Sequence, residues 1–293
     1  MPYARVNGVK LYYEQTGSGT PVIFVHEFAG DTRSWEPQIR FLARRYRCIT
    51  FNARGYPPSE VPASLAKYSQ AIHVDDIAGM LDALNIKKAH IVGCSMGGYA
   101  AVHFAIRYAK RALSSTAIGA GFGSDPDKRA QFLKDTEAQA KRFDDLGMPA
   151  AVQDYKIGPS RVQYANRDPR GYAEFAQQFE GHSALGSANT LRGVQAKRAT
   201  VYDLEKGLRR CKVPMLIVSG DEDDNCLEPG IFIKRMCMSS DLLVVPATGH
   251  AVNLEEPDLF NRVLLDFVSA VDTGAWRPRD PRSLGKSTLS NKG

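Results

Sequence analysis

The sequence predicts an α/β fold with a mostly parallel central sheet, an N-terminal antiparallel hairpin and helices on both faces. Three observations support this prediction. Short apolar runs alternate with segments of helical periodicity, which is typical of parallel βαβ units. An Asn-Gly pair at residues 7–8 separates two alternating segments, as in a tight β-hairpin. The alternation stops between about residues 122 and 212, which indicates a helical cap inserted after the sixth strand.

The predicted elements before the cap begin with the hairpin strands at 3–6 and 9–15. A continuous apolar run at 22–25 follows, and a strand of this kind is expected to be buried on both faces of the sheet. The remaining elements of this half are a helix at 35–44, a strand at 48–51, a helix at 74–84, a strand at 89–92 and a helix at 98–108. After the cap, the same rhythm predicts strands at 215–219 and 242–245 and helices near 231–237 and at 257–271.

These elements divide the chain into three parts. We expect a core of residues 1–121 and 213–272, a helical cap of residues 122–212, and a flexible basic tail of residues 273–293. The tail carries five Lys and Arg against one Asp, or +4 of the formal net charge of +6, so the body of the chain holds only +2. The alternative for the cap is a helical domain with no role at the active site.

Composition excludes several classes of protein. With 43% hydrophobic and 24% charged residues, the 293-residue chain is expected to fold rather than to be disordered. It has neither an uninterrupted apolar run of membrane-spanning length nor a secretory signal, so we expect a cytoplasmic protein with no membrane partner. The five cysteines are widely spaced and predict buried, reduced thiols rather than disulfides or a zinc site. No basic stripe with interleaved aromatic residues points to nucleic acid; a homodimer is left open.

The sharpest local pattern is Gly93-Cys94-Ser95-Met96-Gly97, which follows a predicted strand and opens directly onto a helix. Glycines two positions either side of a serine let the chain turn sharply, so that the hydroxyl projects above the sheet. We therefore predict that Ser95 is a nucleophile. The alternative is a structural serine at a tight turn.

A serine hydroxyl needs an adjacent base held by a third group. His250 lies in a loop directly beyond the last predicted strand, at the sheet edge where open α/β folds bind ligands. The other histidines outside the loop that begins at residue 26 are expected to be structural. The strand at 215–219 runs into the acidic run 221–224, so an orienting carboxylate is present but its identity is open. That run is alternatively a solvated surface loop.

The chain resembles an α/β-hydrolase, with matching elements over about residues 3–272. The family's Gly-x-x-Asp pattern selects Asp223 as the acid, with Asp221 second and Asp224 third. Residues 52–59, Asn-Ala-Arg-Gly-Tyr-Pro-Pro-Ser, are similar to the family's Asp-x-Arg-Gly-x-Gly-x-Ser loop, with Asn and Pro as departures. The predicted insertion falls where the family keeps its cap.

Two backbone amides are expected to form the oxyanion hole. The amide after the nucleophile is that of Met96. The loop at 26–30 resembles the family's His-Gly-x-x-Gly, which implies the Phe28 amide as the second donor. Glu27 replaces the family's glycine, and a carboxylate aimed at the hole would oppose the oxyanion. We expect its side chain to turn away towards an arginine; the alternative is that it touches substrate or water.

Together these residues predict a cofactor-free serine hydrolase that cleaves a carboxylic ester or lactone of a small-molecule substrate. A glycine-rich segment at 118–124 does not complete a dinucleotide motif, because its third glycine position holds Ser124, and no metal-ligand spacing is present. The same triad is alternatively suited to carbon–carbon bonds or amides. A more distant alternative is a small-molecule receptor that has lost turnover.

Overall fold

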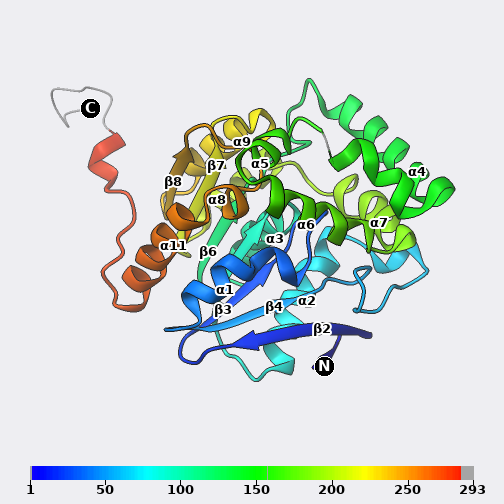
Figure 1. Ribbon diagram of the computed structural model, residues 1–293. Helices are drawn as coiled ribbons and strands as arrows, with labels where there is room; N and C mark the ends of the chain where they lie inside the picture. The colour runs from blue at the N-terminus through cyan, green and yellow to red at the C-terminus, as the bar shows by residue number, and fades with distance from the viewer. Residues whose placement is uncertain (1, 157, 285–293) are drawn as a thin grey trace.

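The computed structural model describes residues 2–156 and 158–284, in which eight strands form one sheet with helices on both faces (Figure 1). The strand order is β1-β2-β4-β3-β5-β6-β7-β8. The pairs β1–β2 and β2–β4 are antiparallel, and every other pair is parallel, which confirms the predicted fold class. The strands are β1 (Tyr3–Val6), β2 (Val9–Thr16), β3 (Pro21–Val25), β4 (Arg47–Phe51), β5 (Ala89–Cys94), β6 (Ala112–Ile118), β7 (Met215–Gly220) and β8 (Ser240–Val245).

The helices of the core lie between these strands and after the last one. They are η1 (Thr32–Trp35), α1 (Glu36–Leu42), η2 (Leu65–Lys67), α2 (Gln70–Ala83), α3 (Met96–Arg107), α9 (Asp224–Met236), α10 (Val252–Glu255) and α11 (Pro257–Asp272), with η5 (Pro281–Leu284) near the end of the chain. None of the helices in the described chain combines the length and the apolarity needed to cross a bilayer.

The apolar alternation of the strands explains why both faces of the sheet are covered. In β3, Val22 and Phe24 join one buried cluster with residues of α1 and α11, whereas Ile23 and Val25 join a second cluster with residues of α2 and α3. Successive side chains of a strand point to opposite faces, so a strand that is apolar at every position needs helices on both sides.

The segment between β6 and β7, residues 122–212, is called the cap below. Its elements are α4 (Arg129–Lys156), α5 (Val162–Arg167), α6 (Pro169–Glu180), α7 (Ala184–Thr190), η3 (Leu191–Gln195), η4 (Tyr202–Leu204) and α8 (Glu205–Arg210), and α4 to α7 group on one side of the molecule (Figure 1). Helix α4 is broken at Gly147, where φ is 71°, two residues before Pro149. A third buried cluster joins Phe143 and Phe179 of the cap to Phe28 and Met96 of the core.

Two elements differ from the sequence prediction in extent. Strand β6 receives no range from the sequence, because Ser114, Ser115 and Thr116 interrupt its apolar run, yet all three are buried. Helix α9 begins at Asp224, seven residues before the predicted start, and contains Pro229. The acidic run before it is typical of a loop, and this polarity conceals the first turns of the helix.

The end of the chain continues from α11 along the core. Trp276 packs against the cluster that contains α11, and its indole Nε1 donates to Asp241 at 3.0 Å. The backbone amide of Arg279 donates to the carbonyl of Met238 at 3.0 Å. These contacts hold the first part of the predicted tail, and residues 285–293 lie outside the described residues.

Candidate active site

Ser95 lies on the sharp turn between β5 and α3. Its backbone has φ 53° and ψ −110°, a conformation that L-residues rarely adopt, and its amide donates to the carbonyl of Ile118 at 2.7 Å. The side chain is half-buried rather than enclosed. The turn therefore presents the Ser95 hydroxyl at the carboxyl edge of the parallel strands, where the sequence predicted it.

Close backbone packing explains the glycines on either side of Ser95. A Cβ on Gly93 would lie 2.0 Å from the carbonyl oxygen of Gly97, and a Cβ on Gly97 would lie 2.0 Å from that of Val25. Both distances are far inside van der Waals contact. The pattern therefore brings α3 against the end of β3, and with it the loop that follows β3.

His250 and Asp223 meet at the ends of β8 and β7. The ring Nδ1 of His250 lies 2.7 Å from Oδ2 of Asp223, and both residues are buried. Because an ionised carboxylate only accepts hydrogen bonds, Nδ1 carries the proton and Nε2 is left as the acceptor. Of the acids that the sequence left open, Asp223 is therefore the one that contacts His250. The Asp221 carboxylate instead accepts from the backbone amide of Thr248, at 3.2 Å.

Contact between His250 and Asp223 shifts the pKa of each residue in the direction that favours an ion pair. Burial alone would lower the pKa of His250, but the charge and hydrogen bond of Asp223 outweigh it and raise that pKa above its usual value. Burial opposes ionisation of Asp223, but His250 lowers the pKa of the carboxyl. Asp223 is therefore ionised at neutral pH, and it stabilises positive charge on the imidazole.

Glu255 braces the loop that carries His250. One carboxylate oxygen accepts from the amide of Gly249 at 2.6 Å, and the other accepts from the amide of Ala251 at 2.8 Å. The carboxylate thus holds the residues on both sides of His250. The sequence analysis missed this role of Glu255. Its only sign in the sequence is that Glu255 lies four residues after Ala251, at the end of the short helix α10.

Ser95, Asp223 and His250 line one cavity of about 350 Å³, called the Ser95 cavity below. Gly119, the residue after β6, packs closely against the histidine, since a Cβ on it would be 3.0 Å from Cε1 of His250. Within the described residues, no hydrogen bond joins the Ser95 hydroxyl to the ring. Such bonds are often long in unliganded enzymes and tighten when substrate binds.

The two predicted oxyanion donors lie at this cavity or next to it. Phe28 lines the cavity, and Met96 is the first residue of α3. The first amides of a helix have no acceptor within the helix and point along its positive end, so the Met96 amide is suited to bind negative charge. The structure thus keeps both residues next to Ser95.

Glu27 is buried and pairs with an arginine, as the sequence analysis expected. Its carboxylate accepts from both terminal nitrogens of Arg161, with Nη1 at 3.1 Å from Oε1 and Nη2 in contact with Oε2. Arg161 precedes α5 in the cap. Sequence alone did not single out which arginine, because the two residues lie 134 positions apart.

The loop after β4 shows why Asn52 replaces the family's aspartate. The Asn52 side-chain amide donates to the carbonyl of Pro57 at 2.7 Å, and its oxygen accepts from the amide of Thr32 at 3.0 Å. A carboxylate would supply only the second bond. Arg54 of the same loop forms a buried ion pair with Asp76 of α2.

The histidine of the loop after β3 is neutral and structural. His26 Nε2 accepts from the amide of Ala53 at 3.0 Å, and burial lowers the pKa of the ring to about 4. In the cap, His182 lies 3.2 Å from the Asp31 carboxylate and joins the cap to the core. Of the histidines among the described residues, only His250 lines the Ser95 cavity.

One group of potential metal ligands was not anticipated from sequence spacing. The ligand-type atoms of Asp223, Cys226 and His250 all lie within 4.8 Å of one another. Burial raises the pKa of the Cys226 thiol well above its usual value, so the sulfur is protonated. The carboxylate and the ring nitrogen are already joined by their own hydrogen bond. The cluster is therefore best described as the His250–Asp223 pair with a neutral thiol packed against it.

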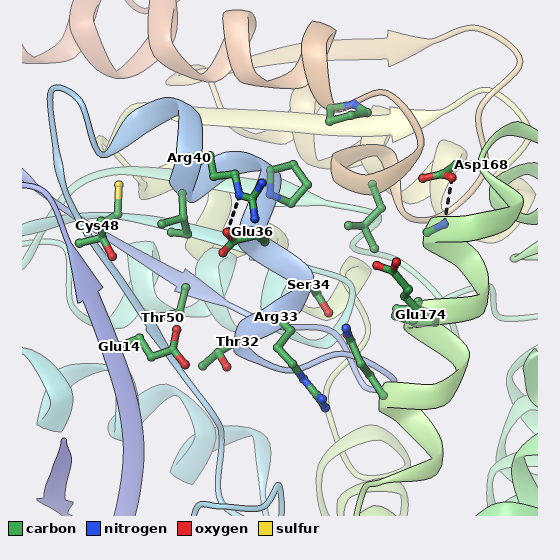
Figure 2. A pocket seen from close by; sticks show the side chains of 18 of the residues that line it. Glu14, Thr32, Arg33, Ser34, Glu36, Arg40, Cys48, Thr50, Asp168 and Glu174 are labelled. Carbon is green, nitrogen blue, oxygen red and sulfur yellow. Dashed lines mark hydrogen bonds and ion pairs between the residues drawn. The ribbon is translucent and has the colours of Figure 1, made fainter. Parts of the chain in front are cut away.

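A larger hollow, of about 640 Å³, lies between the cap and the core, away from the triad residues (Figure 2). In the described lining its charged residues are Glu14, Arg33, Glu36, Arg40, Asp168 and Glu174. Figure 2 shows Arg40 paired with Glu36 and Asp168 bonded to the helix backbone beside it. Both of these interactions lie within a single element, α1 of the core and the start of α6 of the cap.

Comparisons with known proteins agree with this fold. The family model of the alpha/beta hydrolase fold matches residues 20–257. A 3-oxoadipate enol-lactonase of Acinetobacter baylyi is 27% identical, over 85% of this chain and 89% of its own. A putative carbamate hydrolase of Agrobacterium fabrum is 29% identical, over 88% of this chain and 97% of its own. The crystal structure of the enol-lactonase from Burkholderia xenovorans matches with a TM-score of 0.80 at 25% identity, over 92% of this chain and 100% of that one.

Proposed function

The chain belongs to the α/β-hydrolase fold family, and on that premise we propose that it is a serine hydrolase that cleaves a carboxylic ester or lactone through an acyl-enzyme on Ser95. One observation carries the proposal: a serine on a strained strand-to-helix turn shares a cavity with a buried His250–Asp223 pair. This combination supplies a nucleophile, a base and a group that orients the base.

The proposed reaction begins with attack of Ser95 Oγ on the substrate carbonyl carbon. His250 Nε2 takes the hydroxyl proton, and the imidazolium is stabilised by Asp223. The carbonyl oxygen becomes an oxyanion, held by the amides of Phe28 and Met96. Collapse of this intermediate breaks the bond to the leaving alkoxide, which takes the proton from His250 and departs as an alcohol.

The second half of the reaction releases the acid. A water molecule gives its proton to His250 Nε2 and attacks the acyl carbon. As the resulting intermediate collapses and the ester bond to the enzyme breaks, His250 returns the proton to Ser95 Oγ. In a lactone the leaving alcohol and the acid stay in one molecule. The residues of the chain supply all proton transfers, so the proposed reaction requires no cofactor.

The Ser95 cavity favours a compact substrate with apolar groups. Its volume of about 350 Å³ lies at the low end of the range for small-molecule sites. Aromatic and aliphatic side chains dominate one part of the wall, with Phe28, Phe122, Phe132, Tyr155 and Leu191. Short acyl or aromatic esters and small lactones therefore suit this cavity better than long acyl chains.

A panel of p-nitrophenyl esters of graded acyl length, together with small lactones, tests the proposal. We expect turnover to be highest for short chains and to fall as the acyl group outgrows the cavity. Ser95→Ala should lose at least about 10⁴-fold in kcat, the usual cost of removing a triad member. A Ser95→Ala variant that keeps more than a tenth of the wild-type rate would contradict the proposal.

Amide-type hydrolysis is the second candidate, because a 29% identical relative is named a putative carbamate hydrolase. The same triad attacks a carbamate or amide carbonyl, but His250 must then protonate a leaving amine. Parallel assays on matched p-nitrophenyl ester and p-nitroanilide substrates separate the two. A vinylogous diketone in the same assay tests carbon–carbon bond cleavage. If the protein binds a substrate stoichiometrically but releases no product, the receptor alternative is favoured.

A further inference from the structure

The buried pair of Glu27 and Arg161 joins the loop after β3 to the cap. Glu27 is 2% and Arg161 is 1% exposed, so each charge is removed from water. A buried charge without a partner is costly, and two hydrogen bonds between the guanidinium and the carboxylate satisfy this requirement here. The pair is therefore a fixed feature of the folded chain rather than a surface contact.

The position of Glu27 makes its charge relevant to the proposed reaction. It immediately precedes Phe28, whose amide is a proposed oxyanion donor, and its carbonyl accepts from Gly30 to close the turn. A lone carboxylate here would oppose the negative charge that forms on the substrate oxygen. In a site shielded from water that opposition is stronger than at a surface.

The charges of the pair also reach His250. Burial and Asp223 dominate the pKa of this ring, and the two charges act on it in opposite directions, Arg161 lowering the pKa and Glu27 raising it. Their effects therefore offset each other as long as both are present. Removing one of them leaves the other acting on the active site.

The cap holds Arg161 in place by contacts on several sides. Its guanidinium lies 5.0 Å from the ring centre of Phe175 on α6, and its backbone amide donates to Gly158 at 2.9 Å. Its neighbours Gly158, Pro159 and Ser160 line the Ser95 cavity, whereas Arg161 itself is not among the described lining residues. The side chain therefore acts on the loop of the core rather than directly on substrate.

We propose that Arg161 is a positioning residue of the cap that neutralises Glu27 beside the Phe28 amide, so that the proposed oxyanion hole is free of an unpaired carboxylate only with the cap in place. This inference rests on the proposed serine-hydrolase function. It explains how the chain tolerates a glutamate where the family has glycine. It also assigns to the cap a part in the chemical step, in addition to enclosing the substrate.

Removing Arg161 and removing Glu27 should have different effects on kcat. This difference distinguishes the proposal from a purely structural link, whose loss would affect kcat equally in both variants. Arg161→Met leaves an unpaired carboxylate beside the hole. We expect kcat to fall about 10- to 100-fold, at or below the cost of losing an oxyanion donor, because the donor itself stays in place. KM should change by less than about 3-fold, because uniform substrate binding is not altered. Glu27→Gln leaves a cation instead, and its loss in kcat should be at least about 5-fold smaller.

The double variant Glu27→Gln/Arg161→Met provides the sharpest test. It removes both charges, and we expect kcat to recover to within about 5-fold of wild type, which is a coupling of the two sites. A double variant that is as slow as Arg161→Met would overturn the proposal, and so would equal losses in the two single variants. If Arg161→Met does not fold, two other variants provide the test. The double variant removes both charges and Arg161→Lys keeps both, so we expect kcat within about 5-fold of wild type in each.

Steady-state hydrolysis of p-nitrophenyl butyrate, with thermal melting of each variant, provides these measurements. The control is Arg192→Met, which removes a cap arginine that pairs with Glu137 and Asp144, and its kcat should equal that of wild type. Ser95→Ala runs in parallel. If Ser95→Ala is active, the proposed function is refuted. If Ser95→Ala is inactive but Arg161→Met has the kcat of wild type, only the role of Arg161 is refuted.

Discussion

Replacing Asp223 by asparagine tests the geometry of the site at a single atom. The carboxylate Oδ2 lies 2.7 Å from Nδ1 of His250 and is buried with it. An asparagine keeps the size of the side chain but removes its charge, and its amide group disfavours the tautomer that leaves Nε2 as a base. We therefore expect Asp223→Asn to fold and to be almost inactive.

The magnitude follows from the two consequences of the lost charge. The wrong tautomer and the loss of imidazolium stabilisation together cost about 10⁴-fold in kcat in comparable triads. That factor corresponds to about 5.4 kcal/mol of transition-state stabilisation. Since Asp223 is what raises the pKa of His250, and burial lowers it, the acid limb of the pH profile should also move to lower pH.

Asp221→Asn is the matched control, two residues away in the same acidic run. Its side chain is exposed and, within the described part of the chain, accepts a hydrogen bond from the amide of Thr248 rather than from His250, so we expect kcat within about 3-fold of wild type. Ester hydrolysis measured for both variants between pH 5 and 9 provides the comparison. Equal activity of the two variants, or a larger loss in Asp221→Asn, would refute the assignment of the acid.

Three further predictions concern the surroundings of the triad. Glu255→Gln loses one of the two backbone bonds that hold the His250 loop, and we expect about a 10-fold lower kcat and a Tm lower by about 5 °C, measured by kinetics and thermal melting. Gly97→Ala places a Cβ 2.0 Å from the carbonyl oxygen of Val25, so this variant should not yield soluble folded protein on expression. The control is Gly181→Ala, which should fold normally because the nearest atom to its Cβ is 3.3 Å away. His250 must be neutral to accept a proton, and its pKa is raised above the usual histidine value of about 6.5. The kcat/KM of the wild type should therefore fall as the pH drops through a value above about 6.5. An acid limb of the pH profile centred well below about pH 6 would contradict this expectation.

Local patterns predicted the residues whose roles depend on their own stretch of chain. Ser95 stands between glycines that the turn requires, and His250 follows a recognisable last strand, so both were predicted from the residues alone. The acid was different, because Asp221, Asp223 and Asp224 share one short run and only the resemblance to a family selected among them. Which of them faces His250 depends on where β7 ends and α9 begins.

Long-range contacts account for most of what the sequence did not predict. Arg161 meets Glu27 only because the cap folds over the loop after β3, and no local signal marks that contact. Strand β6 was counted from the sequence but given no range, because a parallel strand in the middle of a sheet tolerates buried hydroxyls. One of these is Ser115, which donates to the carbonyl of Ala101 at 3.0 Å. Ser114 of the same strand lies 2.7 Å from His90 Nδ1, another partner that the sequence does not reveal.

Covalent labelling tests the proposed nucleophile most directly. The protein is treated with a fluorophosphonate, digested, and analysed by peptide mass spectrometry, with Ser95→Ala as the control. We expect one stoichiometric adduct on Ser95, with loss of esterase activity in proportion to labelling and no adduct in the control. An unlabelled Ser95 in active protein, or an adduct on another residue that tracks the loss of activity, would contradict the proposed mechanism.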